Sequence, residues 1–324
     1  MKDMKKVFIG VVTFCLLLVV VDMAVGGWSQ KMYHQSKYGI FHRQIYCLTE
    51  SQDELMILGS SRAAHHYVPQ VFEDFLGTSC YNAGSDGMCI YYHYGILASR
   101  IQRGCPPKIV ILEVISTDAE VSQGATFSLD AALDRYAPHY GEFAEIDSLF
   151  AFNGWKERVK LMSKTYRYNS KLVQTIKCNY IPWPEDRGYE ALTGVMQVAE
   201  GDKVNDVLTP STEEPVIEER KLVYLQKFID DCKANNIQLL MCYSPYYGQE
   251  VPKSIRMIEV IATKNDVPFL NYGEDEFFQK PMYFKDAGHL NDTGAFEYSK
   301  EVARVLSNKN KSICPETRKK YCVQ

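Results

Sequence analysis

Short apolar runs alternate with amphipathic stretches from residue 54 to residue 306, and this alternation limits the fold more than any other feature. The clearest run is Ile109–Ile115, which is apolar except for Glu113. Such a run is typical of a strand buried on both faces of a parallel sheet. Four further runs predict strands at 55–58, 80–82, 237–243 and 267–270. The sequence therefore predicts an α/β fold with a doubly wound parallel sheet of about five strands.

Helical patterns separate the predicted strands. They cover residues 68–75, 88–102 and 218–234, and a last one covers 292–306. The interval from about 118 to 215 breaks this rhythm and is rich in aromatic residues. We interpret it as an insertion of helices and loops after the third strand, at the edge of the sheet where such folds build their sites.

The N-terminus carries a separate signal. Lysines at positions 2, 5 and 6 precede an apolar run from Val7 to Gly27, which only Asp22 interrupts. As a helix this run would span roughly 30 Å, the thickness of the hydrocarbon core of a membrane. The lysines predict that the N-terminus stays in the cytoplasm and that the remainder is exported to the periplasm or cell surface. The alternative is a cleaved signal peptide, since residues 24–26 are small enough for a cleavage point.

These signals predict four parts. They are an anchor at 1–28, a linker and lead-in at 29–53, the α/β domain with its insertion at 54–308, and a C-terminal tail at 309–324. Cys314 and Cys322 in that tail are close enough in sequence to form a disulfide in an oxidising compartment.

Composition excludes several classes of function. The net charge is −4, and basic and acidic residues are mixed, so that no nucleic-acid surface is expected. The ten cysteines include no Cys-x-x-Cys pair, which argues against a metal site. We expect neither a metal nor a cofactor.

Three residues carry a pattern for nucleophilic chemistry. Ser61 follows the first predicted strand and precedes a helical segment, where a hydroxyl lies near free backbone N–H groups. Asp286 and His289 lie three residues apart in a glycine-containing loop before the last helix. One loop can therefore let the carboxylate hold one ring nitrogen while the other faces the serine. The structural alternative is that Ser61 only caps its helix.

Three short segments are similar to sequence blocks of the SGNH (GDSL-type) hydrolases. Gly59-Ser60-Ser61 resembles the first block, with Ser60 in place of the usual Asp; residues 82–87 (Asn-Ala-Gly-Ser-Asp-Gly) resemble the second, and residues 286–289 (Asp-Ala-Gly-His) the fifth. The order of the segments along the chain also agrees. The resemblance implies a flavodoxin-like sheet and covers residues 54–116 and 243–306, but not the insertion.

The same resemblance assigns roles. It implies that Ser61 is the nucleophile, that His289 is the general base and acid, and that Asp286 orients His289. The backbone N–H groups of Ser61 and Gly87 would stabilise the oxyanion, and Asn82 would lie at the same site.

One position departs from the family pattern. Thr117 stands where the third block normally has Asn as a further oxyanion donor. Loss of one such donor typically costs about 2.7–4 kcal/mol of transition-state stabilisation. A threonine hydroxyl could substitute for the amide, and we therefore include Thr117 among the oxyanion-binding residues.

The Gly-Ser-Ser form, the single anchor and the segment 286–291 are most similar to one subgroup, which includes the D-alanine transfer protein and alginate O-acetyltransferase-like proteins. This implies an extracytoplasmic serine esterase or O-acyltransferase that acts on acyl esters, such as acetyl esters, of envelope polysaccharide. A membrane-bound O-acyltransferase is the implied partner. The alternative is a non-catalytic module that binds polymer or such a partner, and Thr117 is its best support.

Four neighbouring side chains have more ordinary interpretations. His65 and His66 are expected as a pair on the helix near the mouth of the site rather than as metal ligands. Arg62 suits either an anionic substrate or an internal salt bridge. Glu113, a carboxylate in an apolar strand, requires hydrogen bonds and is expected to brace the loops of the site.

Overall fold

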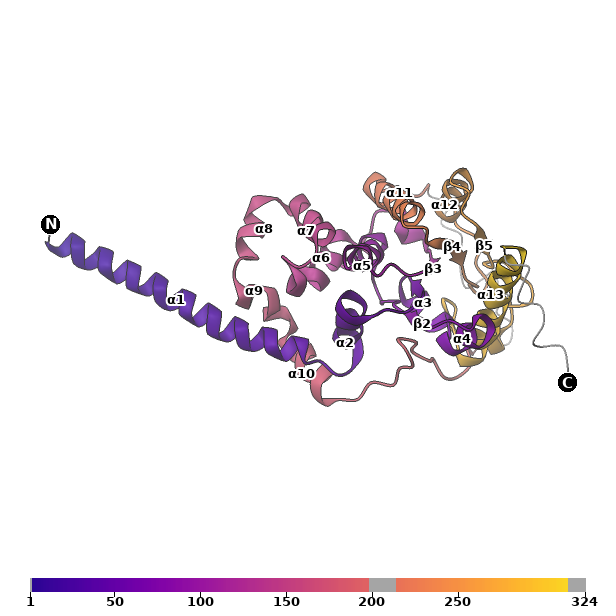
Figure 1. Ribbon diagram of the computed structural model, residues 1–324, viewed down its shortest axis with the longest axis horizontal. Helices are drawn as coiled ribbons and strands as arrows, with labels where there is room; N and C mark the ends of the chain where they lie inside the picture. The colour runs from indigo at the N-terminus through magenta and orange to yellow at the C-terminus, as the bar shows by residue number, and fades with distance from the viewer. Residues whose placement is uncertain (1, 198–213, 314–324) are drawn as a thin grey trace. The chain divides into compact units, whose positions relative to one another are not determined.

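The computed structural model describes residues 2–197 and 214–313 (Figure 1). The chain forms two compact units. Unit 1 combines residues 1–50 with 129–183, and unit 2 combines residues 51–128 with 184–324. The candidate catalytic residues all belong to unit 2.

Unit 2 is built on a parallel sheet of five strands. The strands are β1 (Leu55–Leu58), β2 (Cys80–Asn82), β3 (Ile109–Glu113), β4 (Gln238–Tyr243) and β5 (Phe269–Asn271). Their order is β2-β1-β3-β4-β5, and every neighbouring pair is parallel. This is the flavodoxin-like order, in which loops that follow strands on either side of the first one meet at a common edge. The predicted fold class is confirmed.

Helices cover both faces of this sheet. They are α3 (Ser61–His66), α4 (Pro69–Leu76), α5 (Ile90–Gln102), α11 (Glu219–Ala234), α12 (Lys253–Lys264) and α13 (Asp292–Ile313), with short 3₁₀ turns η2 (Ser116–Asp118) and η7 (Pro281–Tyr283). Figure 1 shows α11 and α12 on one side of the strands and α4 on the other. The sequence did not predict α12. The chain is extended at Tyr67 and Val68; Val68 precedes Pro69, and a residue before a proline avoids the helical region.

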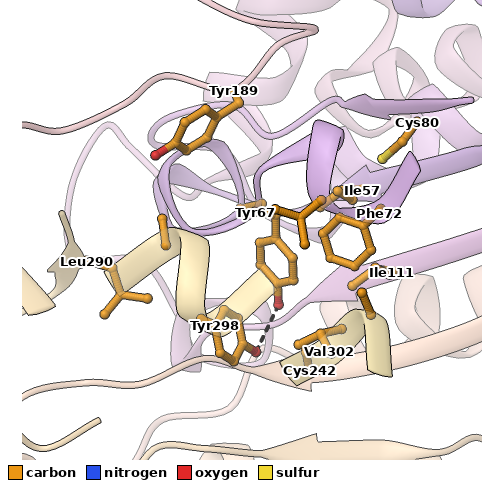
Figure 2. Close-up of a cluster of buried hydrophobic side chains, with 14 of the residues drawn as sticks. Ile57, Tyr67, Phe72, Cys80, Ile111, Tyr189, Cys242, Leu290, Tyr298 and Val302 are labelled. Carbon is orange, nitrogen blue, oxygen red and sulfur yellow. Dashed lines mark hydrogen bonds between the residues drawn. The ribbon is translucent and has the colours of Figure 1, made fainter. Parts of the chain in front are cut away.

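The core on one face joins the sheet to α4 and α13. Ile57 and Ile111 from the strands pack in one cluster with Phe72 from α4 and Tyr298 from α13. Figure 2 shows Tyr67 among these side chains, with its hydroxyl 3.2 Å from that of Tyr298. All four residues of β1 are fully buried, as expected for a strand with helices on both faces.

Unit 1 is helical. Its elements are α1 (Lys2–His34), α2 (Gly39–Ile45), the π-helix η1 (Tyr46–Glu50), α6 (Leu129–Tyr136), η3 (Ala137–His139), α7 (Ala144–Phe150), η4 (Ala151–Asn153), α8 (Gly154–Lys160), α9 (Lys164–Tyr168), η5 (Asn169–Lys171) and α10 (Leu172–Tyr180). Tyr33, Phe41 and Tyr168 belong to its core. The predicted linker at 29–53 is therefore wrong for residues 29–34 and 39–50, which are helical. They fold because their aromatic side chains pack against the insertion.

The insertion itself is divided. Its central part, residues 129–183, is the second segment of unit 1, whereas residues 118–128 and 184–197 belong to unit 2. Residues 198–213, and Cys314 and Cys322 with their predicted disulfide, lie outside the described residues. The predicted tail at 309–324 begins as helix, since α13 continues to Ile313.

The helix α1 meets the length and composition needed to cross a membrane. The qualifying segment is Asp3–His34, and no other helix in the described part of the chain passes the same test. A signal sequence near an N-terminus passes it too.

Candidate active site

Ser61 lies at the turn between β1 and α3, where the backbone has little room. A Cβ at Gly59 would lie 2.7 Å from the Glu113 carbonyl oxygen, and the φ angle of Gly59 is +149°. Only glycine fits there without strain. Ser60 occupies the N-cap position, and Ser61 is the first residue of the helix. Ser61 is therefore not the helix cap.

Asp286 and His289 lie on a two-stranded hairpin that the sequence did not predict. The hairpin pairs β6 (Phe284–Asp286) with β7 (His289–Leu290) in antiparallel fashion. The Asp286 carboxylate accepts the backbone N–H of Gly288 at 2.9 Å, which closes the turn. It also lies 2.9 Å and 3.2 Å from Nδ1 of His289 through its two oxygens.

The structure brings the predicted serine, histidine and aspartate together. Nε2 of His289 lies 2.9 Å from Oγ of Ser61. A carboxylate only accepts hydrogen bonds, so we assign the ring proton to Nδ1, which leaves Nε2 free to accept from the hydroxyl. This is the geometry required of a general base next to a nucleophile. The side chains of His289 and Asp286 are 30% and 59% exposed. This pair, called the dyad below, therefore faces an open surface.

His65 packs edge-on against the imidazole of His289, with ring centroids 5.7 Å apart. Its Nδ1 lies 2.7 Å from the Glu190 carbonyl oxygen, and its Nε2 lies 3.6 Å from the Asp86 carboxylate. Burial lowers the pKa of His65, but the contacts with Asp86 and Glu190 outweigh burial, and its pKa is raised above the ordinary value. These contacts favour the protonated form of His65 next to His289. It forms part of the wall of the site, as expected for this pair.

A buried polar network lies beneath the dyad, centred on Glu113. One of its carboxylate oxygens accepts the N–H of Ser244 at 3.0 Å and the Ser244 hydroxyl at 2.6 Å, and the other accepts the Tyr67 hydroxyl at 2.5 Å. Nε of Arg62 lies 3.3 Å from the same carboxylate. Burial raises the pKa of Glu113, opposed by Arg62 and these hydrogen bonds. The predicted bracing role of Glu113 is confirmed, and Arg62 forms the internal salt bridge rather than a surface contact.

His66 connects this network to the hairpin. Its Nε2 accepts the backbone N–H of Leu290 at 2.9 Å, and its Nδ1 lies 2.7 Å from the Ser244 hydroxyl. Burial lowers the pKa of His66 well below the ordinary value, with a further contribution from Arg62. His66 is therefore neutral at neutral pH, and the residue next to His289 is tied to β4 through it.

The three predicted oxyanion residues have different surroundings. Asn82 is buried and uses both amide hydrogens, which it donates to the Ala63 and Tyr67 carbonyl oxygens at 2.7 Å and 2.9 Å. This corrects the expectation for Asn82: it holds the loop after β2 onto α3 instead of donating to a ligand. The Thr117 hydroxyl is buried and has no hydrogen-bond partner among the described residues. Gly87 has a φ angle of +71°. The oxyanion roles of Thr117 and Gly87 remain predictions.

A buried lysine holds the loop that follows β3. Nζ of Lys221 donates to the carbonyl oxygens of Thr117, Glu120 and Phe127 at 2.9, 2.7 and 2.8 Å. Phe127 in turn donates its N–H to the Gly87 carbonyl oxygen at 2.6 Å. Lys221 therefore positions the backbone around Gly87 from a distance.

Sequence reasoning missed Ser244 and Tyr246. Ser244 follows β4 directly and Tyr246 comes two residues later, at the same edge of the sheet as Ser61, and this position is a signal that could have found them. Tyr246 lies beside the hairpin turn, since a Cβ at Gly288 would be 3.7 Å from its hydroxyl. No group of three His, Cys, Asp or Glu side chains within residues 2–197 and 214–313 is placed to hold a metal ion.

Comparisons with known proteins give remote structural likenesses. No protein-family model matches the chain, and the search of curated proteins finds no match. A GDSL-like lipase from Bacteroides thetaiotaomicron aligns over 83% of this chain and 96% of its own, with 12% identity and a TM-score of 0.36. A protein described as a candidate lipolytic protein of the G-D-S-L family, from Desulfitobacterium hafniense, aligns over 78% and 99%, with 10% identity and a TM-score of 0.39. A candidate acylhydrolase from Bacteroides fragilis aligns over 87% and 95%, with 12% identity and a TM-score of 0.37.

Proposed function

We propose that this chain is a membrane-anchored serine ester hydrolase or O-acyltransferase that acts outside the cytoplasm on acyl esters of envelope polysaccharide. The observation that carries the proposal is the hydrogen-bonded series from Asp286 through His289 to Ser61. A serine hydroxyl becomes a useful nucleophile when a positioned base takes its proton, and a carboxylate on the far ring nitrogen holds the base in the required tautomer.

The mechanism follows from these positions. Nε2 of His289 takes the proton of Ser61 as Oγ attacks the ester carbonyl. The tetrahedral oxyanion is stabilised by backbone N–H groups, for which Ser61 at the start of α3 and Gly87 are the candidates. His289 then gives its proton to the leaving alcohol, and an acyl-Ser61 intermediate remains. Water or a sugar hydroxyl, deprotonated by His289, attacks this intermediate; His289 then returns the proton to Oγ of Ser61, which leaves as the free hydroxyl while the acid or new ester is released.

The exposed dyad favours a large substrate. A polymer chain can reach an ester only where the nucleophile lies at an open surface, and both His289 and Asp286 are accessible to solvent. Tyr246, which is half-buried beside the turn, offers an aromatic face of the kind that packs on sugar rings. Transfer rather than hydrolysis requires a second sugar hydroxyl as acceptor, and a membrane-bound O-acyltransferase is the proposed partner that would supply or receive the acyl group.

Labelling with a fluorophosphonate probe tests the proposal. The wild-type chain is expected to react covalently, and S61A is expected to remain unlabelled. S60A is the matched control, because the neighbouring Ser60 hydroxyl is buried and has no hydrogen-bond partner in the described part of the chain; it should label like the wild type. An unlabelled wild type from pH 6 to 9 would instead support a non-catalytic binding module.

A second measurement separates the two reactions. The purified chain is given an activated acetyl ester with and without deacetylated oligosaccharides. Acetate alone as product indicates a hydrolase, whereas acetylated oligosaccharide that depends on Ser61 indicates a transferase. Formation of neither product, despite labelling of Ser61, would contradict the proposed substrate class while leaving the nucleophile in place.

A further inference from the structure

The helix α1 is joined to the body of unit 1 at a defined point along its length. The Asp22 carboxylate accepts the Ser163 hydroxyl at 2.5 Å and the backbone N–H groups of Lys164 and Thr165, both at 3.0 Å. The carboxylate thus accepts the free backbone N–H groups at the start of α9. One turn further on, a Cβ at Gly26 would lie only 2.4 Å from Cβ of Lys164. The two helices therefore meet in close contact between Asp22 and Gly26.

This contact lies near the depth at which α1 would leave a membrane. From Val7 to Val21 the uncharged helix measures only about 22 Å, whereas a hydrocarbon core of about 30 Å needs about 20 residues. The remaining residues of the span are those from Asp22 to Gly26, on which α9 is docked. Asp22 can be accommodated there because its oxygens are already hydrogen-bonded. The segment that precedes α9 is consequently brought to the outer boundary of the bilayer.

That segment carries four exposed apolar side chains, two of them on α8. We call Phe152, Trp155, Val159 and Met162 the α8 stripe. Trp155 and Val159 lie about one turn apart on α8 and therefore on the same side of it, whereas Phe152 belongs to η4 and Met162 follows the end of α8. Their side chains are between 47% and 75% exposed, although large apolar residues usually pack inside. Met162 directly precedes Ser163, the residue bonded to Asp22. Figure 1 shows α8 and α9 at the side of unit 1 toward which the free length of α1 extends.

The charges around the stripe suit a lipid surface. Lys156, Arg158 and Lys160 are exposed and alternate with the apolar positions. Only one acidic residue, Glu157, lies within α8, and it pairs with Lys160 at 3.0 Å. A tryptophan-bearing apolar face flanked by basic residues is the composition of helices that lie in the interface of a membrane.

We propose that the α8 stripe lies in the interfacial layer of the same bilayer that α1 crosses, with the flanking basic residues toward lipid phosphates. Unit 1 is then held at the membrane by two elements, a crossing helix and a helix lying in the surface. The occupant of the apolar face is lipid rather than another protein, because α1 itself fixes the distance from α9 to the membrane. This inference rests on the anchor in the proposed function, but not on the chemistry of Ser61.

The three tryptophans of the chain make the proposal measurable. Trp155 belongs to the stripe, whereas Trp183 lies 3.9 Å from the Cβ position of Gly39, past the end of α1 at His34. His34 is about 18 Å from Asp22 along the helix. The variants W28F/W183F and W28F/W155F leave only Trp155 or only Trp183. Full-length protein of each kind is reconstituted in vesicles of phosphatidylcholine and phosphatidylglycerol, with bromines near the top of the acyl chains in one set.

The expected result is a large loss of Trp155 emission in the brominated vesicles and little loss for Trp183. Aqueous iodide should quench them in the opposite order. Equal quenching of both by iodide, with no effect of bromolipid on Trp155, would overturn the proposal. The intact mass of the same samples tests the anchor separately, since removal of residues before 27 would refute the anchor itself. Failure of Ser61 to label would leave the quenching unchanged.

Discussion

Nε2 of His289 lies 2.9 Å from Oγ of Ser61, although 228 residues separate the two in the chain. The contact exists because Ser61 follows β1 and the hairpin with His289 follows β5, and the ends of parallel strands share one edge of the sheet. The histidine is held from two sides. Asp286 binds its Nδ1 at the surface, and His66 binds the next residue, Leu290, from the interior.

We expect D286N to lower kcat by about 10–100-fold, with a smaller change in KM. A buried aspartate in this role typically contributes about 10⁴-fold. Asp286 is 59% exposed, and water can therefore replace part of its interaction with Nδ1. The measurement is the steady-state hydrolysis of an activated acetyl ester. A loss as large as that of S61A would show that orientation by Asp286 is indispensable despite its exposure, and an unchanged kcat would remove Asp286 from the mechanism.

Replacing Glu113 should destabilise the fold rather than alter the chemistry directly. E113Q leaves the buried guanidinium of Arg62 without its carboxylate, and such a loss typically costs about 3–5 kcal/mol. The double variant R62Q/E113Q removes the unpaired charge as well. Its free energy of unfolding should be closer to that of the wild type than the sum of the single changes. Denaturant unfolding measures all four proteins, and strictly additive losses would contradict a coupled pair.

The Lys221 contacts predict an effect on the acylation rate. K221M removes three hydrogen bonds to the loop after β3, including the one to Phe127, which itself binds Gly87. We expect a loss of about 3 kcal/mol of stability or more, because buried carbonyl oxygens lose their donor. We also expect slower fluorophosphonate labelling in the folded variant at temperatures well below its unfolding midpoint. Destabilisation with an unchanged labelling rate would show that the lysine supports the fold alone.

Much of the site was predictable because parallel strands give strong local signals. The run at 109–115 and the run at 55–58 identified β3 and β1, and their C-terminal ends located Ser61. The hairpin at 284–290 was not predicted, because its strands have three and two residues and are too short to show the alternation of apolar and polar residues typical of a strand. Its existence depends instead on contacts such as His66 with Leu290, which no local pattern contains.

Residues 29–50 also could not be predicted from local sequence. They carry no long amphipathic pattern, and were therefore expected to be a linker. In the structure the Tyr33 hydroxyl donates to Gln44 at 3.1 Å and lies 3.2 Å from Nε2 of His139. His139 comes from the insertion, about a hundred positions later in the chain. Structure that depends on such distant partners cannot be inferred from a window of neighbouring residues.

The last prediction concerns a buried pair, His93 and Asp118, whose effects on stability oppose each other. Burial raises the pKa of Asp118 from 3.8 to about 7, and burial lowers the pKa of His93 from 6.5 to about 3. Alone, Asp118 stabilises the fold below pH 3.8 and loses that contribution as the pH rises through 7. Alone, His93 stabilises the fold above pH 6.5 and loses that contribution as the pH falls through 3. Between pH 4 and 6.5 the folded and unfolded chains therefore bind equal numbers of protons at this pair, and the two slopes cancel.

Single substitutions should separate the two slopes. In D118N only His93 remains, and between pH 4.5 and 6 stability should rise by up to about 1.4 kcal/mol per pH unit relative to the wild type. In H93Q only Asp118 remains, and stability should fall by a similar amount over the same interval. Urea unfolding of the detergent-solubilised chain at several pH values gives both differences, and referring each variant to the wild type removes the contributions of all other groups. Slopes of the same sign would contradict the opposite pKa shifts of these two buried side chains, which lie 3.9 Å apart.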